Sequence, residues 1–436
     1  MSKMNVDIDI ETLEMPLEKP WPIMSPLAYQ GLAGEIVNEL ASQSEADSVA
    51  LLMTVLTSYG NACGRGAFFP VGATDHRANL FCCLVGKSSK ARKGTSGDLV
   101  KALFRFADPD WVNNHRVSGL SSGEGIPWLG RDEDGETSTP DEKPKYSKVQ
   151  KAMVGRPKLT DDKRLFIDES EFGIVLKNAS RSGNNLSQIL RLLWDGNRLE
   201  SVTKNSHFTC TGMHGSIVAH ITLAELKRLL TVSDISNGFA NRFLWMCVRR
   251  SQLLPFGGDL SKLQELGKRL GKALSTSRGV GKMQYSLDAR DLWDKVYRGE
   301  LALEHDGTVG DATNRAEAQA LRSSEIYALL GGTDVIEVEH LKAGLAVVEY
   351  AGESAEYIFG DLQSGLAEKI LALLENAGAL GLSRTEISNG LGRNFTSSKI
   401  LAALASLEKK GAAIKTLVKC HSGGRPEENW RFSARG

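Results

Sequence analysis

Four short apolar runs place the strongest limit on the fold of this chain. A continuous apolar run bounded by turn-forming residues is typical of a strand that is buried on both faces, as in a parallel sheet. The stretches between the runs show helical spacing. Strands that alternate with helices predict an α/β domain with a largely parallel sheet. The four runs are RANLFCCLVG, RLFIDESEF, GSIVAHIT and RFLWMCVRR.

The composition fits such a domain and excludes several classes of protein. The chain has 436 residues, 41% hydrophobic and 24% charged, enough for two or three domains with their own cores. Its formal net charge is zero, so any affinity for nucleic acid must come from local patches. The six cysteines form no Cys-x-x-Cys pair, which argues against zinc and a disulfide framework. With no membrane-length apolar run and no signal-peptide pattern, we expect a cytoplasmic protein without membrane contact.

Shifts in pattern and composition divide the chain into five segments. The first is acidic and rich in proline, and an internal stretch of the third is polar and lacks periodicity. The segments are a flexible arm (1–26), a helical N-terminal segment (27–78), the sheet-forming core (79–255, with a mobile insertion at 131–163), a helical segment (256–362) and a compact C-terminal domain (363–436).

The stretch after the first run contains the parts of a phosphate-binding loop. The usual signature is G-x-x-x-x-G-K-[ST]; here Gly86 ends the strand, but an alanine replaces the second glycine and Lys93 precedes Gly94. Such a loop needs backbone N–H groups at a helix start, a lysine for the phosphates and a hydroxyl for Mg²⁺. Lys93 and either Thr95 or Ser96 supply these groups. A basic surface loop after a strand is the alternative.

The second run ends in Asp168 and Glu169, the Walker B form. One carboxylate of such a pair holds Mg²⁺ and the next polarises the attacking water. A strand that ends in solvated acids is common, but both motifs in this order are much rarer. The pair therefore favours binding and hydrolysis of ATP with Mg²⁺, with Asp168 and either Thr95 or Ser96 on the metal and Glu169 as the catalytic carboxylate; the family resemblance described below implies Thr95.

Polar residues flank the other two runs. His220 and Thr222 end the third run, where they could sense a γ-phosphate, although a histidine there is more often a packed core residue. Arg242 precedes the fourth run. An arginine there can neutralise charge on the ATP of a neighbouring subunit, or simply cap a strand at the surface.

Two further stretches carry weaker signals. In GLSSGEGI, Ser121 or Ser122 followed by Glu124 predicts a helix N-cap rather than a catalytic glutamate. The stretch TKNS lies between two core strands, where a hairpin or pore loop could touch nucleic acid. Lys204 within it is a candidate DNA contact.

The C-terminal segment has the rhythm of a winged helix. Its first helix ends near Ala377, and Ser383 with Glu386 forms a capping box that opens the second. The third helix closes at Gly411, and a strand pair brackets a wing.

This segment is basic within a neutral chain. Residues 384–431 contain nine Lys or Arg and four Asp or Glu, a net charge of +5. Basic residues around a helix-turn-helix favour binding of duplex DNA, and docking to a protein is the alternative. The candidate DNA contacts are Arg393, Asn394, Ser398, Lys399 and Arg425.

The order of these motifs resembles that of the AAA+ ATPases, closest to the helicase branch that includes the minichromosome maintenance proteins. Several stretches are also similar to a family of phage-, prophage- and plasmid-borne helicase-like ATPases, whose members are often encoded beside, or fused to, primases. The resemblance covers roughly residues 28–360. It rests on GLAGEIVNEL, KARKGTS, GLSSGEGI, LLWDGNRLESVTKNS and NGFANRFLWMCVRRS.

The resemblance implies a AAA+/RecA-like P-loop core, with residues 256–362 as a helical lid. It implies a homo-oligomeric ring, such as a hexamer, in which Arg242 acts on the neighbour's ATP. Arg322, or less favourably Arg315, would be the lid arginine that contacts phosphate in the same chain. The implied function is a replicative DNA helicase of a phage or mobile element, with a possible primase partner. An ATP-gated switch in an anti-phage or regulatory complex and a non-catalytic DNA-binding scaffold are the alternatives.

Overall fold

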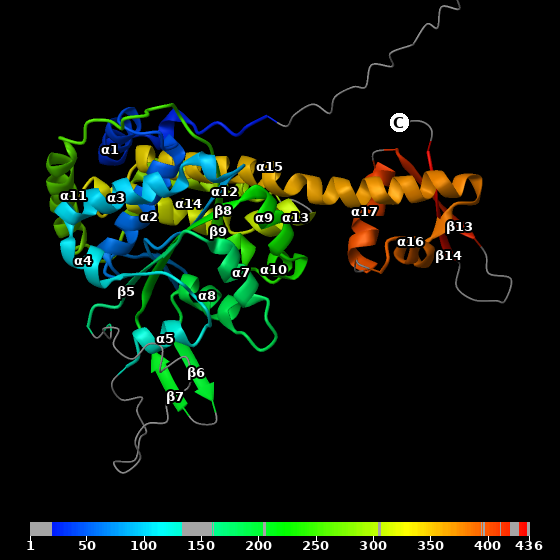
Figure 1. Ribbon diagram of the computed structural model, residues 1–436, viewed down its shortest axis with the longest axis horizontal. Coiled ribbons are helices and arrows are strands. Elements are labelled where there is room, and N and C mark those ends of the chain that lie inside the picture. The colour runs from blue at the N-terminus through cyan, green and yellow to red at the C-terminus, as the bar shows by residue number, and fades with distance from the viewer. Residues whose placement is uncertain are drawn as a thin grey trace, which may run out of the picture.

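The centre of the molecule is an all-parallel sheet of five strands in the order β4-β5-β8-β3-β9 (Figure 1). The four predicted strands are confirmed, and so is the α/β class. Among the five strands of this sheet, the sequence missed β4, which is two residues long. The strands are β3 (Phe81–Gly86), β4 (Arg116–Val117), β5 (Arg164–Glu169), β8 (His214–Thr222) and β9 (Phe243–Val248). The computed structural model describes residues 20–132, 159, 161–203, 206–303, 307–393, 395, 397–409, 411–418 and 427–433.

Alternate residues of each strand enter two different hydrophobic cores. In β3, Cys82 and Leu84 join one core, whereas Phe81, Cys83 and Val85 join the other. This alternation follows from the two-residue period of a strand. The sheet is therefore covered on both faces, as the continuous apolar runs predicted.

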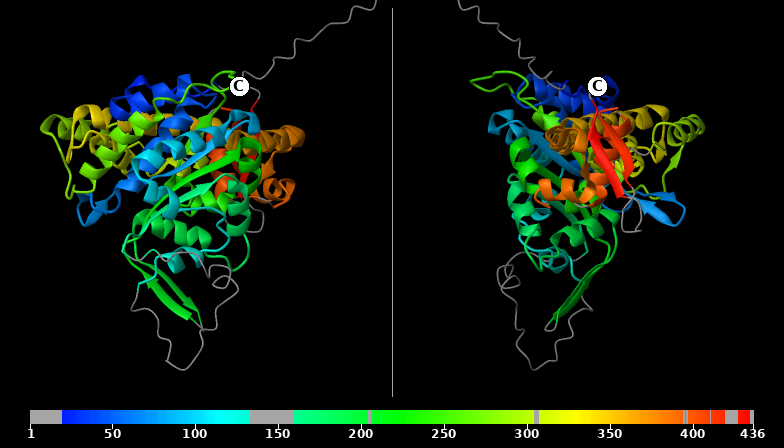
Figure 2. Two further views of the ribbon diagram at one scale, coloured as in Figure 1. Left: turned by 60° about the vertical axis from the view of Figure 1, so that its left-hand side comes forward. Right: turned by 90° about the vertical axis from the view of Figure 1, so that its right-hand side faces the viewer.

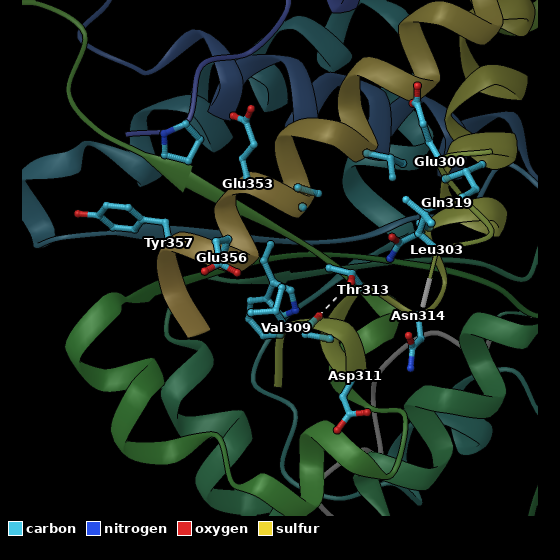
Figure 3. A pocket seen from close by; sticks show the side chains of 18 of the residues that line it. Glu300, Leu303, Val309, Asp311, Thr313, Asn314, Gln319, Glu353, Glu356 and Tyr357 are labelled. Atoms are coloured by element: carbon cyan, nitrogen blue, oxygen red, sulfur yellow. Dashed lines mark hydrogen bonds between the residues drawn. The ribbon is translucent and has the colours of Figure 1, made fainter. Parts of the chain in front are cut away.

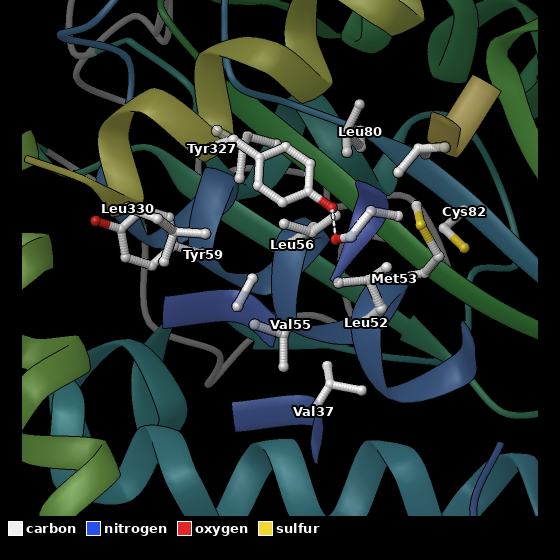
Figure 4. Close-up of a cluster of buried hydrophobic side chains, with 14 of the residues drawn as sticks. Val37, Leu52, Met53, Val55, Leu56, Tyr59, Leu80, Cys82, Tyr327 and Leu330 are labelled. Carbon is white, nitrogen blue, oxygen red and sulfur yellow. Dashed lines mark hydrogen bonds between the residues drawn. The ribbon is translucent and has the colours of Figure 1, made fainter. Parts of the chain in front are cut away.

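The first core contains the N-terminal helices and most of the predicted lid. Its centre is α2, in which every residue after Ser48 is buried, and the side chain of Asp47 caps the helix start. Tyr327 packs beside α2 and donates its hydroxyl to the Ala28 carbonyl at 2.6 Å (Figure 4). The segments predicted as 27–78 and 256–362 are thus one packed unit. Its helices are α1 (Gly31–Ser42), α2 (Ser48–Cys63), α3 (Lys93–Ala107), α4 (Pro109–Asn114), α11 (Leu263–Ser277), α12 (Leu287–Arg298), α14 (Ala316–Leu330) and the first part of α15 (Val338–Ala377).

The second core lies on the other face of the sheet. A two-stranded hairpin extends from this side, away from α1 (Figure 2). The helices are α5 (Gly125–Leu129), α7 (Phe172–Ala179), α8 (Leu186–Asp195), α9 (Leu223–Leu229), α10 (Val232–Ser236) and α13 (Gly307–Thr313), and the hairpin is β6 (Leu199–Thr203) with β7 (Ser206–Cys210). Short elements on both sides of the sheet complete the described part of residues 20–362: η1 (Pro26–Ala28), β1 (Phe69–Val71), β2 (Thr74–His76), η2 (Ser89–Ala91), η4 (Ala240–Arg242), β10 (Gln284–Tyr285) and β11 (Val335–Ile336).

A third core belongs to the C-terminal domain. Helix α15 crosses into it without a break: Phe359 packs in the second core and Leu366 in the third. The predicted boundary at 362/363 therefore falls inside one helix, where that helix changes cores. The capping box of Ser383 and Glu386 is confirmed. The remaining elements are η5 (Gly378–Leu380), β12 (Leu382–Ser383), α16 (Arg384–Gly390), α17 (Ser397–Lys409), β13 (Ala413–Val418) and β14 (Glu427–Phe432), with strand order β12-β14-β13.

The predicted arm ends earlier than residue 26. The ring of Trp21 packs edge-on against Tyr357, with 5.1 Å between centroids, so the ordered chain includes Pro20 onward. Residues 1–19 lie outside the described residues, as does most of the predicted insertion. Within the described part of the chain, no helix is both long and apolar enough to cross a lipid bilayer.

Candidate functional site

Except for Arg322, the predicted nucleotide-binding residues lie at one edge of the sheet. All five strands are parallel, so their carboxyl ends lie at the same end of the sheet, which we call the carboxyl edge. Ligands of open α/β sheets bind at this end. Strand β8 lies between β3 and β5, and His220 pairs in register with Leu84 while Val218 pairs with Asp168. His220 therefore lies between the loop after β3 and the carboxylates of β5.

The loop from Gly86 to Lys93 closes over the end of β3. A Cβ on Gly86 would lie 2.6 Å from the Ala91 Cβ and 3.0 Å from the Lys93 Nζ, so only glycine fits there. Arg92 adopts a left-handed conformation with φ of 55°, which turns the chain into α3. As a result Lys93 is the first residue of the helix, and its side chain folds back over the loop.

Lys93 is buried without an ion pair to any described residue. It is 8% exposed, and its Nζ donates to the Ser88 carbonyl at 3.3 Å. Burial lowers the pKa of Lys93, while Cys83 and Glu171 act in the opposite direction. Glu171 follows β5 and was missed by the sequence motifs. A buried ammonium whose one hydrogen-bond partner is a carbonyl is well suited to bind an anionic oxygen.

The structure separates the two hydroxyls that the sequence left open. Ser96 is fully buried, and its Oγ donates to the Lys93 carbonyl at 2.7 Å. Thr95 is half-buried, so its hydroxyl is the more accessible candidate for Mg²⁺. A Cβ on Gly94 would meet no atom within 4 Å, which leaves the backbone open at the helix start.

Asp168 lies at the site and pairs with Arg116, a residue that the motifs did not indicate. An Nη of Arg116 donates to the Asp168 carboxylate, whose side chain is 31% exposed. The guanidinium of Arg116 also lies over the rings of Trp111 and Phe166, at 5.6 and 5.2 Å from their centroids. The ion pair restrains the carboxylate, and the exposed part of Asp168 can still bind a metal.

Glu169 has a different position from the one predicted for a catalytic base. Its side chain is buried, and Oε1 accepts the Leu120 N–H at 2.8 Å. Burial raises the pKa of Glu169, and the backbone N–H groups of Leu120 and Gly119 oppose that shift. In this arrangement Glu169 anchors the 119–120 loop and does not face Lys93. The predicted serine N-cap nearby is wrong, because α5 begins after Glu124 with no side-chain cap.

The two predicted sensor residues differ in their surroundings. His220 is 5% exposed, and its Nε2 has no hydrogen-bond partner among the described residues. Burial lowers the pKa of His220 to about 4, with Asp168 raising it and Lys93 lowering it. The imidazole is therefore neutral and coupled to both groups. Thr222 caps α9, where its Oγ1 accepts the Glu225 N–H at 3.3 Å.

Three arginines lie around Trp194 at the amino ends of the strands, which we call the amino edge. The guanidinium carbons of Arg242, Arg315 and Arg322 lie 5.7, 4.9 and 3.7 Å from the Trp194 centroid. Arg242 pairs with Asp195 at 2.7 Å, and Arg315 approaches the same carboxylate at 3.7 Å. Arg242 directly precedes β9, so the cluster lies at the amino ends of the strands.

The position of Arg322 conflicts with a phosphate contact in its own chain. Its Nη1 donates to the carbonyls of Asn79 and Trp194 at 3.1 and 3.0 Å. Asn79 precedes β3, whereas the phosphate loop follows it. The six residues of β3 span about 20 Å at roughly 3.3 Å per residue. The prediction for Arg322 is therefore wrong for this arrangement, and the less favoured Arg315 lies in the same cluster. Arg242 is also far from its own loop, as a residue acting on a neighbour would be.

The structure describes some of the predicted DNA contacts and not others. Lys204, Asn394 and Arg425 lie outside the described residues. Ser398 and Lys399 lie in the first turn of α17. Arg393 is exposed, has a φ of 57°, and donates from Nε to the Asn389 Oδ1 at 2.9 Å.

A cavity and a cluster of acidic residues with a histidine lie away from the predicted nucleotide-binding residues. A cavity of about 1350 Å³ lies beside β9, and none of the predicted site residues lines it (Figure 3). Asp110, His115 and Asp162 have ligand atoms within 4.8 Å of one another, but Arg164 pairs with both carboxylates. That group is an ion-pair network at the opposite edge from Lys93.

The chain was compared with protein-family models and with curated proteins, and neither comparison produced a match.

Proposed function

We propose that the chain binds and hydrolyses ATP with Mg²⁺ at the carboxyl edge of the sheet. The observation that carries this proposal is the position of Lys93: it is buried at a helix start, folded over Gly86, and lacks an ion pair with any described residue. An ammonium placed there, beside backbone N–H groups at the positive end of α3, suits a polyphosphate.

Each nearby group has a part in this proposal. The Nζ of Lys93 exchanges the Ser88 carbonyl for a phosphate oxygen. Asp168 and Thr95 would hold Mg²⁺, which would neutralise charge on the phosphates. His220 is neutral, so its ring can donate or accept a hydrogen bond. Glu169 acts on water only after it releases the Leu120 N–H, which would couple hydrolysis to movement of the 119–120 loop.

The amino-edge arginines support action between subunits. Arg242 lies at the opposite end of the sheet from its own Lys93, so any nucleotide that it contacts belongs to another chain. A ring, such as a hexamer, brings the two edges of neighbouring chains together. In such a ring, Asp195 must give up Arg242 to the neighbour's phosphate.

We further propose that the C-terminal domain is a winged helix that binds DNA. The end of α15, α16 and α17 pack with the β12-β14-β13 sheet in the order helix, strand, helix, helix, strand, strand. Helix α17 follows the Arg393 turn, as a recognition helix does. Deleting residues 366–436 removes one complete core, and it should weaken duplex binding and reduce its dependence on salt. Unchanged DNA binding over a range of salt would instead assign this domain to protein docking.

The whole chain is then proposed to be a helicase of a phage or mobile element, in which hydrolysis drives movement along DNA. ATP hydrolysis and strand displacement measured on one preparation separate this from its alternatives. A helicase shows both activities. An ATP-gated switch hydrolyses ATP without displacing a strand, and a non-catalytic scaffold binds DNA and does neither.

A further inference from the structure

The phosphate loop turns into α3 at a residue whose backbone conformation is rare. Arg92 has a φ of 55°, and the described chain has a positive φ at two non-glycine residues, Arg92 and Arg393. The usual signature has glycine directly before its lysine, and glycine adopts this conformation without steric strain. In an arginine, the Cβ crowds the following carbonyl oxygen. The surrounding structure must therefore hold Arg92 in this conformation.

A carboxylate from another part of the chain pairs with the Arg92 side chain. Glu45 lies in the turn between α1 and α2, and its Oε2 is 2.6 Å from the Arg92 Nε. This is the one ion pair that Arg92 forms with a described residue. The Arg92 side chain is 48% exposed and that of Glu45 is 14% exposed, so the acid is the more firmly packed partner.

Glu45 is itself held by the segment that follows β9. Its Oε1 accepts the Leu254 N–H at 3.0 Å, and its Oε2 lies 3.8 Å from the Arg250 Nε. Its backbone carbonyl accepts the Ser251 N–H at 3.2 Å. The Leu254 N–H lowers the pKa of Glu45, burial opposes that shift, and Arg250 and Arg92 add to it. The carboxylate is therefore charged at neutral pH and is oriented by contacts other than Arg92.

The conformation of Arg92 determines where Lys93 lies. The left-handed turn makes Lys93 the first residue of α3, and from there its Nζ reaches back to the Ser88 carbonyl at 3.3 Å. If Arg92 relaxed to the right-handed region, the chain would enter α3 in another direction and the ammonium would leave the loop. No hydrogen bond or ion pair joins Glu45 to Lys93 in the described structure, so Glu45 acts on Lys93 through Arg92.

From these contacts we propose that Glu45 is a positioning residue of the nucleotide site: it holds Arg92 in the left-handed conformation and thereby keeps Lys93 over the loop. This inference rests on the proposed function. Without the carboxylate the closed loop is less populated, and the apparent affinity for phosphate falls with the closed fraction. A bound phosphate selects the closed loop in either case, so turnover at saturating ATP stays the same.

Calorimetric titration of the full chain with inorganic triphosphate tests the proposal. Glu45→Gln should weaken affinity about two- to fivefold, since a partly exposed charge pair contributes modestly. The KM for ATP should rise by the same factor at unchanged kcat. Glu39→Gln is the matched control: Glu39 is an acid of α1 that pairs with Lys262 at 2.8 Å, and its replacement should leave affinity and KM unchanged.

A second substitution separates positioning from a purely structural role. Arg92→Gly added to Glu45→Gln should restore most of the lost affinity, because glycine adopts the left-handed conformation without an anchor. If Glu45 only stabilised the segment after β9, the double variant would bind as weakly as Glu45→Gln. That result would overturn the proposal, and so would equal affinity of Glu45→Gln and the native chain.

Acetylation of lysines, measured by mass spectrometry, tests the anchor without nucleotide. Lys93 is 8% exposed, so its labelling requires the loop to open. Glu45→Gln should label Lys93 at least about twofold faster relative to Lys90, an exposed lysine of the same loop. Unchanged labelling would contradict the anchor. Faster labelling in a protein whose native form binds no triphosphate would confirm the anchor and contradict the nucleotide site.

Discussion

The two edges of the central sheet both hold buried cations, but they hold them in different ways. At the carboxyl edge, Lys93 has a single neutral partner, the Ser88 carbonyl. At the amino edge, Arg242 has the Asp195 carboxylate at 2.7 Å and the Gly238 carbonyl, and its guanidinium lies near the Trp194 ring. The pair of Arg242 and Asp195 joins opposite charges, whereas the Lys93 ammonium bonds to a neutral carbonyl and has no compensating charge among its hydrogen-bond partners.

Because of this difference, Lys93 is available to bind an anion, whereas Arg242 is restrained by its carboxylate partner. A buried ammonium without a counterion is costly, and the lowered pKa of Lys93 expresses that cost. An arriving phosphate relieves it. Arg242 is already compensated, so it moves only if a competing anion approaches. The structure therefore predicts different consequences for changes at the two edges.

The largest effect is expected from Lys93→Ala. Loss of the buried ammonium should weaken ATP binding and reduce turnover by about 10³-fold, the upper range for removal of one charge-stabilising contact. Nucleotide binding and phosphate release measure the two effects. Lys90→Ala is the control, because Lys90 is an exposed lysine of the same loop. Equal losses in both variants would mean that the loop acts through its overall charge.

The next effect is expected from Arg242→Ala. ATP binding should be nearly unchanged while turnover falls by about 10³-fold, as for other arginines that act between subunits. Mixing this variant with Lys93→Ala should restore part of the activity, because some interfaces then pair an intact lysine with an intact arginine. Light scattering must first show that the variants assemble. Loss of ATP binding by an unassembled Arg242→Ala chain would contradict action between subunits.

A smaller effect on stability should follow from Asp195→Asn. This change leaves Arg242 and Arg315 without their shared carboxylate, and it should lower the free energy of unfolding by about 2 kcal/mol. Asp75→Asn is the control, because Asp75 pairs with Arg77 at the surface with 45% of its side chain exposed; it should cost at most about 1 kcal/mol. Denaturant titration compares them. Equal effects would show that the amino-edge pair restrains Arg242 no more than a surface pair does.

An effect that appears only below pH 6.5 concerns two histidines at the two ends of β8. Burial lowers the pKa of both His214 and His220 to about 4, so the unfolded chain binds more protons between pH 4 and 6.5. Their contribution to stability is therefore complete above pH 6.5 and is lost as the pH falls towards 4. Each should contribute up to about 1.4 kcal/mol per pH unit in that window. The free energy of unfolding of His220→Asn should therefore change less steeply with pH in this window than that of the native chain.

Binding of inorganic triphosphate beside Lys93 should change the pKa of one of these two histidines and not that of the other. Lys93 lowers the pKa of His220, so neutralising that ammonium should raise the pKa of His220 and leave that of His214 unchanged. NMR titration of the ring protons measures both. Equal shifts at both ends of β8 would contradict binding at the carboxyl edge.

Local patterns in the sequence were sufficient for much of the fold. A continuous apolar run marks a strand covered on both faces, so β3, β5, β8 and β9 were predicted within a few residues. The capping box of Ser383 and Glu386 was also predicted correctly, because capping depends on residues three apart. The two-residue β4 is too short to carry a periodic signal. The sequence alone also could not show that the predicted lid and the N-terminal helices share one core.

By itself, the sequence determined that Lys93, Asp168 and His220 come together, because each follows a predicted strand and parallel strands end at one edge. Only the tertiary structure decided how the side chains are used. Glu169 and Asp168 are neighbours in the chain, yet one anchors a loop and the other faces the site, because successive residues of a strand point to opposite sides. Arg322 lies on Trp194, far from the phosphate loop, because helix α14 packs at the amino ends of the strands. Such long-range packing leaves no mark in a local motif.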